Sequence, residues 1–248
     1  MLCHEELSDF SPDVDQAVRS LNESQNPPHS LETRCVVKDA FDAAMAKGSP
    51  HSKLCDVVPN DFGPWVDSVS QFVNMMRCDS RCVHHTLTLF LKYTHSLTRI
   101  QWNSLYWHRL ACLWIAIKYT NSDFDEIHLF VVKPGAKRSL IAAEIDVMRG
   151  VNYEMAAPPD YMYMLGVLLE VPPSIMIIAS TFFDTLLKTP LLWVGVPHVL
   201  VCAACIVAAC EDQNGPTTTE MLTPKIVELG VADTRTLLSF SEKVLLHN

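Results

Sequence analysis

Basic side chains are scarce in this sequence. Its 248 residues include 19 Lys and Arg against 28 Asp and Glu, so the formal net charge is −9 at pH 7. A nucleic-acid-binding protein needs clustered positive charge to contact phosphates, and this balance argues against one. Hydrophobic residues make up 49% of the chain, enough for the core of one large domain or two modest ones. We therefore expect a globular chain whose partner is another protein.

Signals for secretion and for membrane insertion are also missing. The opening MLCHEELSDF has neither a basic segment nor an apolar run, so we expect no signal peptide. The one long apolar stretch, 191–210, is interrupted by Gly195, Pro197 and His198, and no Lys/Arg cluster flanks it. We interpret it as a buried helix that begins near Pro197. The nine cysteines are irregularly spaced and several lie in apolar runs, as is typical of reduced thiols. These features predict an intracellular protein, in the nucleus, the cytoplasm or both, with no membrane partner.

The sequence contains no nucleophile elbow, no HExxH, no Gly-rich phosphate loop and no paired-carboxylate site. The run CDSRCVHH at 78–85 places two cysteines beside two histidines, but no second Cys/His pair follows at zinc-ligand spacing. Cys202 and Cys205 have the spacing of a redox pair, but their surroundings are apolar and no strand precedes them. We therefore expect no enzyme, no metal and no cofactor, and packed side chains at both places.

No segment alternates with period two, so we expect no sheet. Apolar residues recur instead at helical spacing, which predicts an all-α fold. Residues 1–59 are acidic, polar and turn-prone, and predict a partly ordered N-terminal extension with one helix around 35–45. Beyond this extension, the break AAPP at 156–159 separates two series of helical segments. The predicted units are 60–156 and 157–248.

Each of these two units contains five predicted helices. In the first unit they cover 64–77, 81–95, 104–119, 125–132 and 140–151. In the second unit they cover 160–169, 173–187, 197–210, 218–229 and 233–247. Ser139 is the expected N-cap of the segment 140–151. The third segment is the most apolar in both series, which indicates a structural repeat.

Two consecutive stretches resemble the cyclin box: RLACLWIAIKYTNSDFDEIHLFV at 109–131 and LIAAEIDVMRGVNYEMAAPPDYM at 140–162. In cyclins the third helix ends in a lysine, which falls here on Lys118. The fifth helix carries a glutamate, here Glu144, followed by an aromatic and an aliphatic residue, here Tyr153 and Met155. A proline-led break into a second five-helix repeat comes next. The resemblance therefore implies two tandem five-helix cyclin-box repeats, and the AAPPDY junction is similar to that of D-type and virus-encoded cyclins.

The resemblance implies a regulatory subunit that binds and activates a cyclin-dependent serine/threonine kinase as a heterodimer, and so controls cell-cycle progression. Lys118 would donate to backbone carbonyls, and Glu144 would accept from backbone amides, next to the C helix of the kinase. Apolar anchors would surround this pair. The residues implied at the kinase interface are Lys118, Glu144, Tyr153, Met155, Ile127 and Phe130.

The substrate-docking side of the cyclin pattern is different here. Many cell-cycle cyclins have a Met-Arg-Ala-Ile-Leu stretch and a later tryptophan in the first helix, which form a groove for substrates and inhibitors. This chain has DFGPWVDSV at 61–69, with Trp65 in place of a leucine and Ser68 in place of the tryptophan. A docking groove would fall on Trp65, Val66 and Tyr106.

Other interpretations remain open from the sequence. On the simplest interpretation, Lys118 and Glu144 form an ordinary salt bridge between neighbouring helices. Transcription-associated proteins share the cyclin fold but need basic helices to bind DNA. A helical adaptor would retain the fold without activating a kinase.

Overall fold

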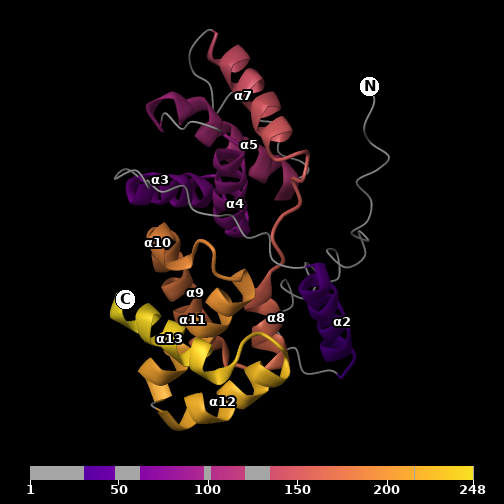
Figure 1. The fold of residues 1–248 in the computed structure, drawn as a ribbon, viewed down its shortest axis with the longest axis vertical. Helices are drawn as coiled ribbons and strands as arrows, with labels where there is room; N and C mark the ends of the chain where they lie inside the picture. The colour runs from indigo at the N-terminus through magenta and orange to yellow at the C-terminus, as the bar shows by residue number, and fades with distance from the viewer. Residues whose placement is uncertain (1–30, 48–61, 98–101, 121–134, 215, 248) are drawn as a thin grey trace.

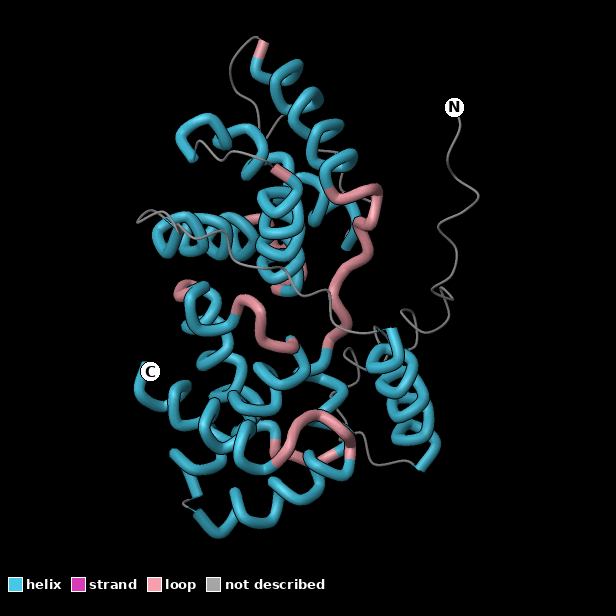
Figure 2. Tube along the Cα trace, viewed as in Figure 1, coloured by secondary structure: helices cyan, strands magenta, loops and turns pink. Residues whose placement is uncertain are grey.

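The structure of the protein is a computed structural model, which describes residues 31–47, 62–97, 102–120, 135–214 and 216–247. Helices connected by loops account for this part of the chain (Figure 2), and it contains no strand. The predicted all-α class is therefore confirmed. The predicted helix over 125–132 lies outside the described residues.

The first helix of the described chain is α2 (Leu31–Lys47), within the predicted extension. Among the described residues between 62 and 150, the helices are α3 (Phe62–Met75), α4 (Arg81–Ser96), the 3-10 helix η1 (Trp102–Leu105), α5 (Tyr106–Thr120) and α7 (Ala136–Gly150). The helices beyond residue 160 are α8 (Tyr161–Leu168), α9 (Pro173–Leu187), α10 (Pro190–Trp193), α11 (His198–Asn214), α12 (Pro216–Glu228) and α13 (Thr234–His247).

These bounds match ten of the predicted segments to within a few residues, counting the helix around 35–45. Two short helices, η1 and α10, were not predicted. The start of α7 was predicted wrongly: it begins at Ala136, after Gly135, whose φ of 88° suits glycine. Ser139 consequently lies inside the helix and is not its N-cap.

The helices α3, α4, α5 and α7 form an upper group (Figure 1). Helix α5 packs against both α4 and α7, and residues 111–117 of α5 are all buried. Helix α3 contributes one apolar stripe to this core, made of Val66, Val69 and Val73. The middle of α5 is thus enclosed by its neighbours, and Lys118 and Tyr119 in its last turn are exposed.

Helices α8 to α13 form a lower group built around α11 (Figure 1). Helix α11 packs against α8, α9, α12 and α13, and all residues from Val199 to Cys210 are buried. It starts directly after Pro197, whose carbonyl accepts the backbone N–H groups of Leu200 and Val201. The apolar stretch 191–210 is thus divided between α10 and a buried helix. No helix in the described ranges combines the length and apolar character needed to span a membrane.

Helix α2 packs on the lower group, although it comes first in the chain. It lies against α8 (Figure 1), where Phe41 meets Tyr161 edge to face with ring centroids 6.0 Å apart. Arg34 forms an ion pair with Glu170 just beyond α8. Part of the predicted extension is therefore a helix with its own place in the fold.

Candidate partner-binding site

Lys118 and Glu144 meet where the last turn of α5 passes α7. The Lys118 ammonium forms an ion pair with Oε1 of Glu144. The indole Nε1 of Trp114 donates to Oε2 of the same carboxylate over 3.2 Å. The Lys118 side chain is 39% exposed and that of Glu144 is 13% exposed. The pair therefore lies at the surface, with its carboxylate set deeper than its ammonium group.

Trp114 organises this pair because it precedes Lys118 by one helical turn. Residues four apart lie on the same face of a helix. The Lys118 Nζ atom is 5.0 Å from the centroid of the Trp114 ring, within the range of a cation–π contact. Each carboxylate oxygen of Glu144 accepts from its own donor. The Lys118 ammonium contacts both the Glu144 carboxylate and the Trp114 ring. The three side chains hold one another in a defined orientation.

The same helices expose several large apolar side chains. Tyr119 follows Lys118 directly, and Ile141 and Ile145 flank Glu144 one turn apart on α7. All three are exposed, at 42%, 40% and 38% respectively. Exposed apolar side chains gathered beside a polar pair are typical of a protein-binding surface.

A turn after α7 presents Tyr153, which is 54% exposed. Asn152 and Tyr153 both have left-handed backbones, with φ of 53° and 60°. The Tyr153 amide donates to the carbonyl of Met148 and the Glu154 amide to that of Val151. Met155 is partly buried against the core. Of the predicted apolar anchors that the structure describes, Tyr153 therefore projects outward and Met155 turns inward.

Helix α4 holds this turn from the interior. The Nε2 atom of His85 lies 2.9 Å from the carbonyl oxygen of Met155, so Nε2 carries the proton and donates. His85 is fully buried and contacts Tyr119 edge to face. Burial lowers the pKa of His85 to about 4. Lys92, two turns further along α4, forms an ion pair with Glu154 over 3.8 Å.

Two residues implied at the kinase interface, Ile127 and Phe130, lie outside the described residues. The three proposed docking residues differ in how much of each side chain is exposed. Val66 is buried in the core and does not reach the surface, whereas Tyr106 is exposed. Trp65 is partly buried, and the Arg109 guanidinium lies 5.3 Å from its ring centroid. These three side chains do not form one exposed groove.

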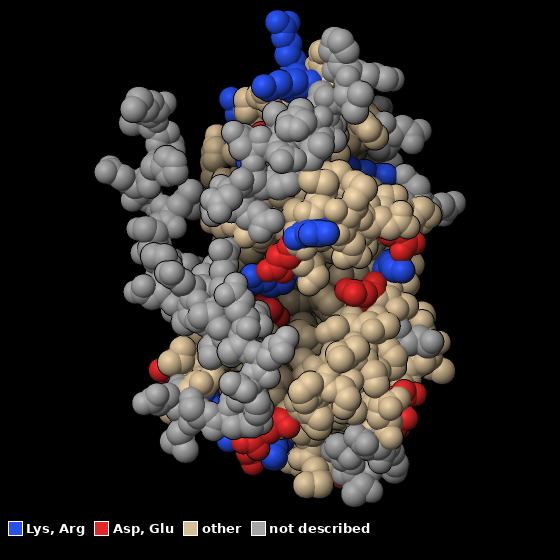
Figure 3. Space-filling view, turned by 180° about the vertical axis from the view of Figure 1, so that it is seen from behind, with Lys and Arg blue, Asp and Glu red and all other residues tan. Residues whose placement is uncertain are grey.

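A cavity of about 290 Å³ lies between the upper and lower groups of helices. It is lined by the start of α4, the connection 157–160, and helices α8, α9 and α11. Figure 3 shows the molecule hollowed between the two groups, with acidic and basic side chains at the rim.

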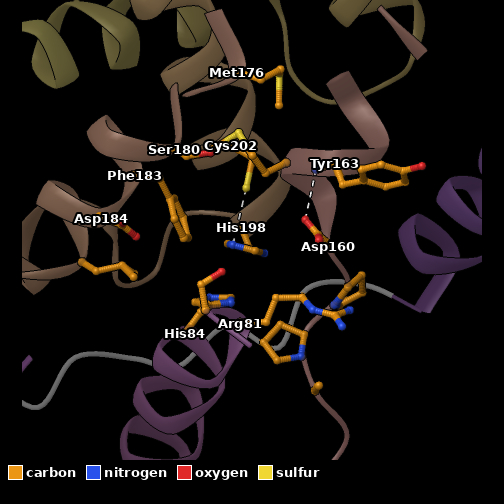
Figure 4. Close-up of a pocket in the computed structure, with 16 residues that line it drawn as sticks. Arg81, His84, Asp160, Tyr163, Met176, Ser180, Phe183, Asp184, His198 and Cys202 are labelled. Carbon is orange, nitrogen blue, oxygen red and sulfur yellow. Dashed lines mark hydrogen bonds between the residues drawn. The ribbon is translucent and has the colours of Figure 1, made fainter. Parts of the chain in front are cut away.

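Two histidines meet where the upper group contacts the lower group. Figure 4 shows His84 of α4 facing His198 of α11. Their rings are stacked with centroids 3.9 Å apart. Burial lowers the pKa of His198 to about 3, and burial together with His198 lowers the pKa of His84 well below its usual value. Both imidazoles are neutral at pH 7.

The cysteines and histidines noted in the sequence have separate partners. Cys82 Sγ lies 2.7 Å from Thr120 Oγ1, and burial raises its pKa to about 11. Burial also raises the pKa of Cys202 and Cys205, so both thiols stay protonated at neutral pH. Within the described ranges, no group of three or more His, Cys, Asp or Glu side chains could hold a metal ion.

A scan of the sequence against models of known protein families finds no match, and a comparison with curated proteins finds none either. Trp114, His85 and the two exposed isoleucines belong to the geometry of the site, and sequence reasoning missed them. The i, i+4 spacing of Trp114 and Lys118 was the one available signal for the first of these.

Proposed function

We propose that this chain is a regulatory subunit that binds and activates a cyclin-dependent serine/threonine kinase. The observation that carries the proposal is the Lys118–Glu144 pair, located at the surface of helices that also expose Tyr119, Ile141 and Ile145. The sequence resemblance assigns the kinase-binding role to this same pair. A tandem pair of cyclin-box repeats is part of the proposal, supported by the helix order on either side of 151–160.

The chemistry of activation explains why such a pair is useful. A kinase that needs an activator keeps its C helix displaced, and its catalytic Lys–Glu ion pair is then incomplete. An activator must bind the inward position more tightly than the displaced one. Lys118 would donate to carbonyls, and Glu144 would accept from amides, beside that helix. Charge-assisted hydrogen bonds to backbone groups are stronger than neutral ones and do not depend on the kinase side chains.

The apolar side chains would supply most of the binding energy. Interfaces depend on a few buried anchors, and aromatic residues are frequent among them. Tyr119 directly follows Lys118 and Tyr153 follows the end of α7; both are exposed aromatics, and Ile141 and Ile145 add two exposed aliphatic side chains on α7. Trp114 would keep Glu144 oriented while Lys118 exchanges its intramolecular acceptor for the kinase.

Binding of purified cyclin-dependent kinases to Lys118→Ala/Glu144→Ala tests the proposal. We expect the double variant to stay folded, because an ion pair at the surface contributes only ~0–1 kcal/mol, and loss of the acceptor of the buried Trp114 N–H costs about 1–3 kcal/mol more. Affinity for the kinase that binds the unaltered chain should fall at least tenfold, since two charge-assisted contacts are lost. Isothermal calorimetry measures this directly.

The matched control is Lys188→Ala/Asp67→Ala, which removes another surface ion pair between separate elements. It should leave affinity unchanged. Glu144→Gln is a second variant that preserves an acceptor for Trp114, so a loss of affinity there cannot come from misfolding. Full retention of binding in both site variants would contradict the proposed role, and a DNA shift in place of kinase binding would favour a transcription-associated protein.

A further inference from the structure

The turn Asn152–Met155 combines strain with unusual anchoring. Two consecutive residues other than glycine, Asn152 and Tyr153, occupy the left-handed region. Such conformations are unfavourable for residues other than glycine, more so for Tyr than for Asn, and persist where surrounding contacts hold them. Strained segments of this kind are concentrated at binding sites. The strain here is borne by the residues that present Tyr153 to solvent.

The contacts that hold the turn come from α7 and α4. Backbone hydrogen bonds tie the Tyr153 amide to Met148 and the Glu154 amide to Val151, both at the end of α7. From α4, the His85 side chain donates to the Met155 carbonyl. The Lys92–Glu154 pair is long and its carboxylate is mostly exposed, so its contribution is small. His85 is therefore the principal side-chain anchor of the turn.

Histidine is an unfavourable residue at position 85 if that position serves only to pack the core. Its side chain is fully buried, and its Nδ1 atom has no hydrogen-bond partner among the described residues. A buried acceptor without a partner destabilises the fold, because it has lost its hydrogen bonds to water. An apolar residue such as leucine would fill this core position without that cost. The imidazole does something that leucine cannot do, which is to fix the Met155 carbonyl.

We infer that His85 is a positioning residue for partner binding, which fixes the Asn152–Met155 turn so that Tyr153 is presented in its binding orientation before the partner arrives. The inference rests on the proposed function for the identity of that partner. A preorganised anchor binds more tightly because less conformational freedom is lost on association. The edge-to-face contact of His85 with Tyr119 extends the same support to the residue beside Lys118.

Three variants separate this role from ordinary core packing. His85→Leu removes the donor and also removes the unpartnered Nδ1. His85→Gln places an amide N–H near the position of Nε2 and restores the donor. Thr86→Val is the matched control, because Thr86 is also buried on α4 but donates to the Cys82 carbonyl and not to the turn.

The first measurement is amide hydrogen exchange at Tyr153, Glu154 and Met155 in the full chain alone. We expect exchange to be about fivefold faster in His85→Leu, near the unaltered rate in His85→Gln, and unchanged in Thr86→Val. The second measurement is affinity for the cyclin-dependent kinase that binds the unaltered chain. We expect His85→Leu to bind about 2- to 10-fold more weakly, with recovery in His85→Gln and no loss in Thr86→Val.

Thermal unfolding of His85→Leu serves as the readout that a purely structural role would move. We expect its midpoint to change little, because the lost hydrogen bond is offset by removal of a buried acceptor. Unchanged exchange in His85→Leu would overturn the inference, and so would faster exchange with unchanged affinity. Failure of every kinase to bind the unaltered chain would overturn the proposed function and the partner half of this inference, while the exchange data would still decide whether His85 holds the turn.

Discussion

Trp114 shows how a single buried residue defines the surface beside it. Its indole N–H occupies Oε2 of Glu144, which leaves Oε1 for Lys118. Because Trp114 is itself buried, the carboxylate is held from the protein interior and not by solvent. A partner that approaches Lys118 therefore meets a carboxylate already oriented for it.

Gly150, at the end of α7, lies close against side chains of α4. A Cβ atom there would lie 2.6 Å from Cδ2 of Tyr93 and 2.8 Å from Oγ of Ser96. We predict that Gly150→Ala lowers the free energy of unfolding by about 1–3 kcal/mol through overpacking, measured by urea denaturation. Gly63→Ala is the control, because its Cβ would meet only the Lys188 carbonyl at 3.4 Å. Equal stability of the two variants would contradict this close approach.

Residue-level prediction from the sequence was partial, for a geometrical reason. The pairing of Lys118 with Glu144 followed from a resemblance, and the structure brings these side chains together. His84 and His85 were considered together because they are adjacent in the chain. Successive residues on a helix point about 100° apart, so His84 faces α11 and His85 faces the turn after α7. Neither partner is near in sequence, and no local pattern indicates it.

The helices themselves were the more predictable elements. Ten predicted segments correspond to observed helices. Most have an apolar stripe, because burial of one face imposes the 3.6-residue period, whereas α5 and α11 are apolar over most of their surface because their neighbours enclose them. Helices η1 and α10 have four residues each, too few to show a period. The early start of α7 depends on the positive φ of Gly135, which a capping pattern alone does not reveal.

Helix α8 offers a test of capping at the start of the second group. The Asp160 carboxylate accepts from the Tyr163 amide over 3.0 Å (Figure 4), and burial raises the pKa of Asp160 above its usual value. We predict that Asp160→Ala loses about 1 kcal/mol of stability at pH 7, because the cap is removed. Asp160→Asn should be as stable as the unaltered chain or more stable, since it keeps an acceptor without a buried charge.

The raised pKa of Asp160 also determines how its contribution to folding stability changes with pH. A carboxyl group with a raised pKa in the folded state favours folding most at low pH, and this contribution is lost as the pH rises through the folded pKa. Chemical denaturation at pH 4 and pH 7 compares the two regimes. A result in which Asp160→Asn and Asp160→Ala are equally destabilised at pH 7 would show that the cap makes no contribution.

At the scale of the whole molecule, neutral histidines join the two groups of helices. His84 of α4 stacks on His198 of α11, which also contacts Tyr161 and Phe183. The pKa of His198 falls from the usual 6.5 to about 3 through burial. A histidine with a lowered pKa stabilises the fold fully above its unfolded pKa, and this contribution is lost as the pH falls below that value. We therefore expect acid to destabilise the contact between the two groups of helices.

We predict that stability declines between pH 6.5 and pH 4, and that His198→Phe weakens this dependence. Phenylalanine keeps a ring against His84 but does not titrate. At pH 5 the unaltered chain should lose about 2 kcal/mol more than His198→Phe, relative to pH 7.5, because each lowered pKa contributes about 1.4 kcal/mol per pH unit. Urea titrations across this range measure the difference. Parallel pH profiles for the two proteins would contradict the neutral stack.

Kinase activation tests the account most directly. A cyclin-dependent kinase that binds the chain is assayed on a peptide substrate alone, with the unaltered chain, with Lys118→Ala/Glu144→Ala, and with the Lys188→Ala/Asp67→Ala control. We predict strong activation by the unaltered chain and the control, and at least tenfold weaker activation by the site variant at equal subsaturating concentration. Binding without activation would instead identify a helical adaptor, and activation that does not depend on Lys118 and Glu144 would contradict the central claim.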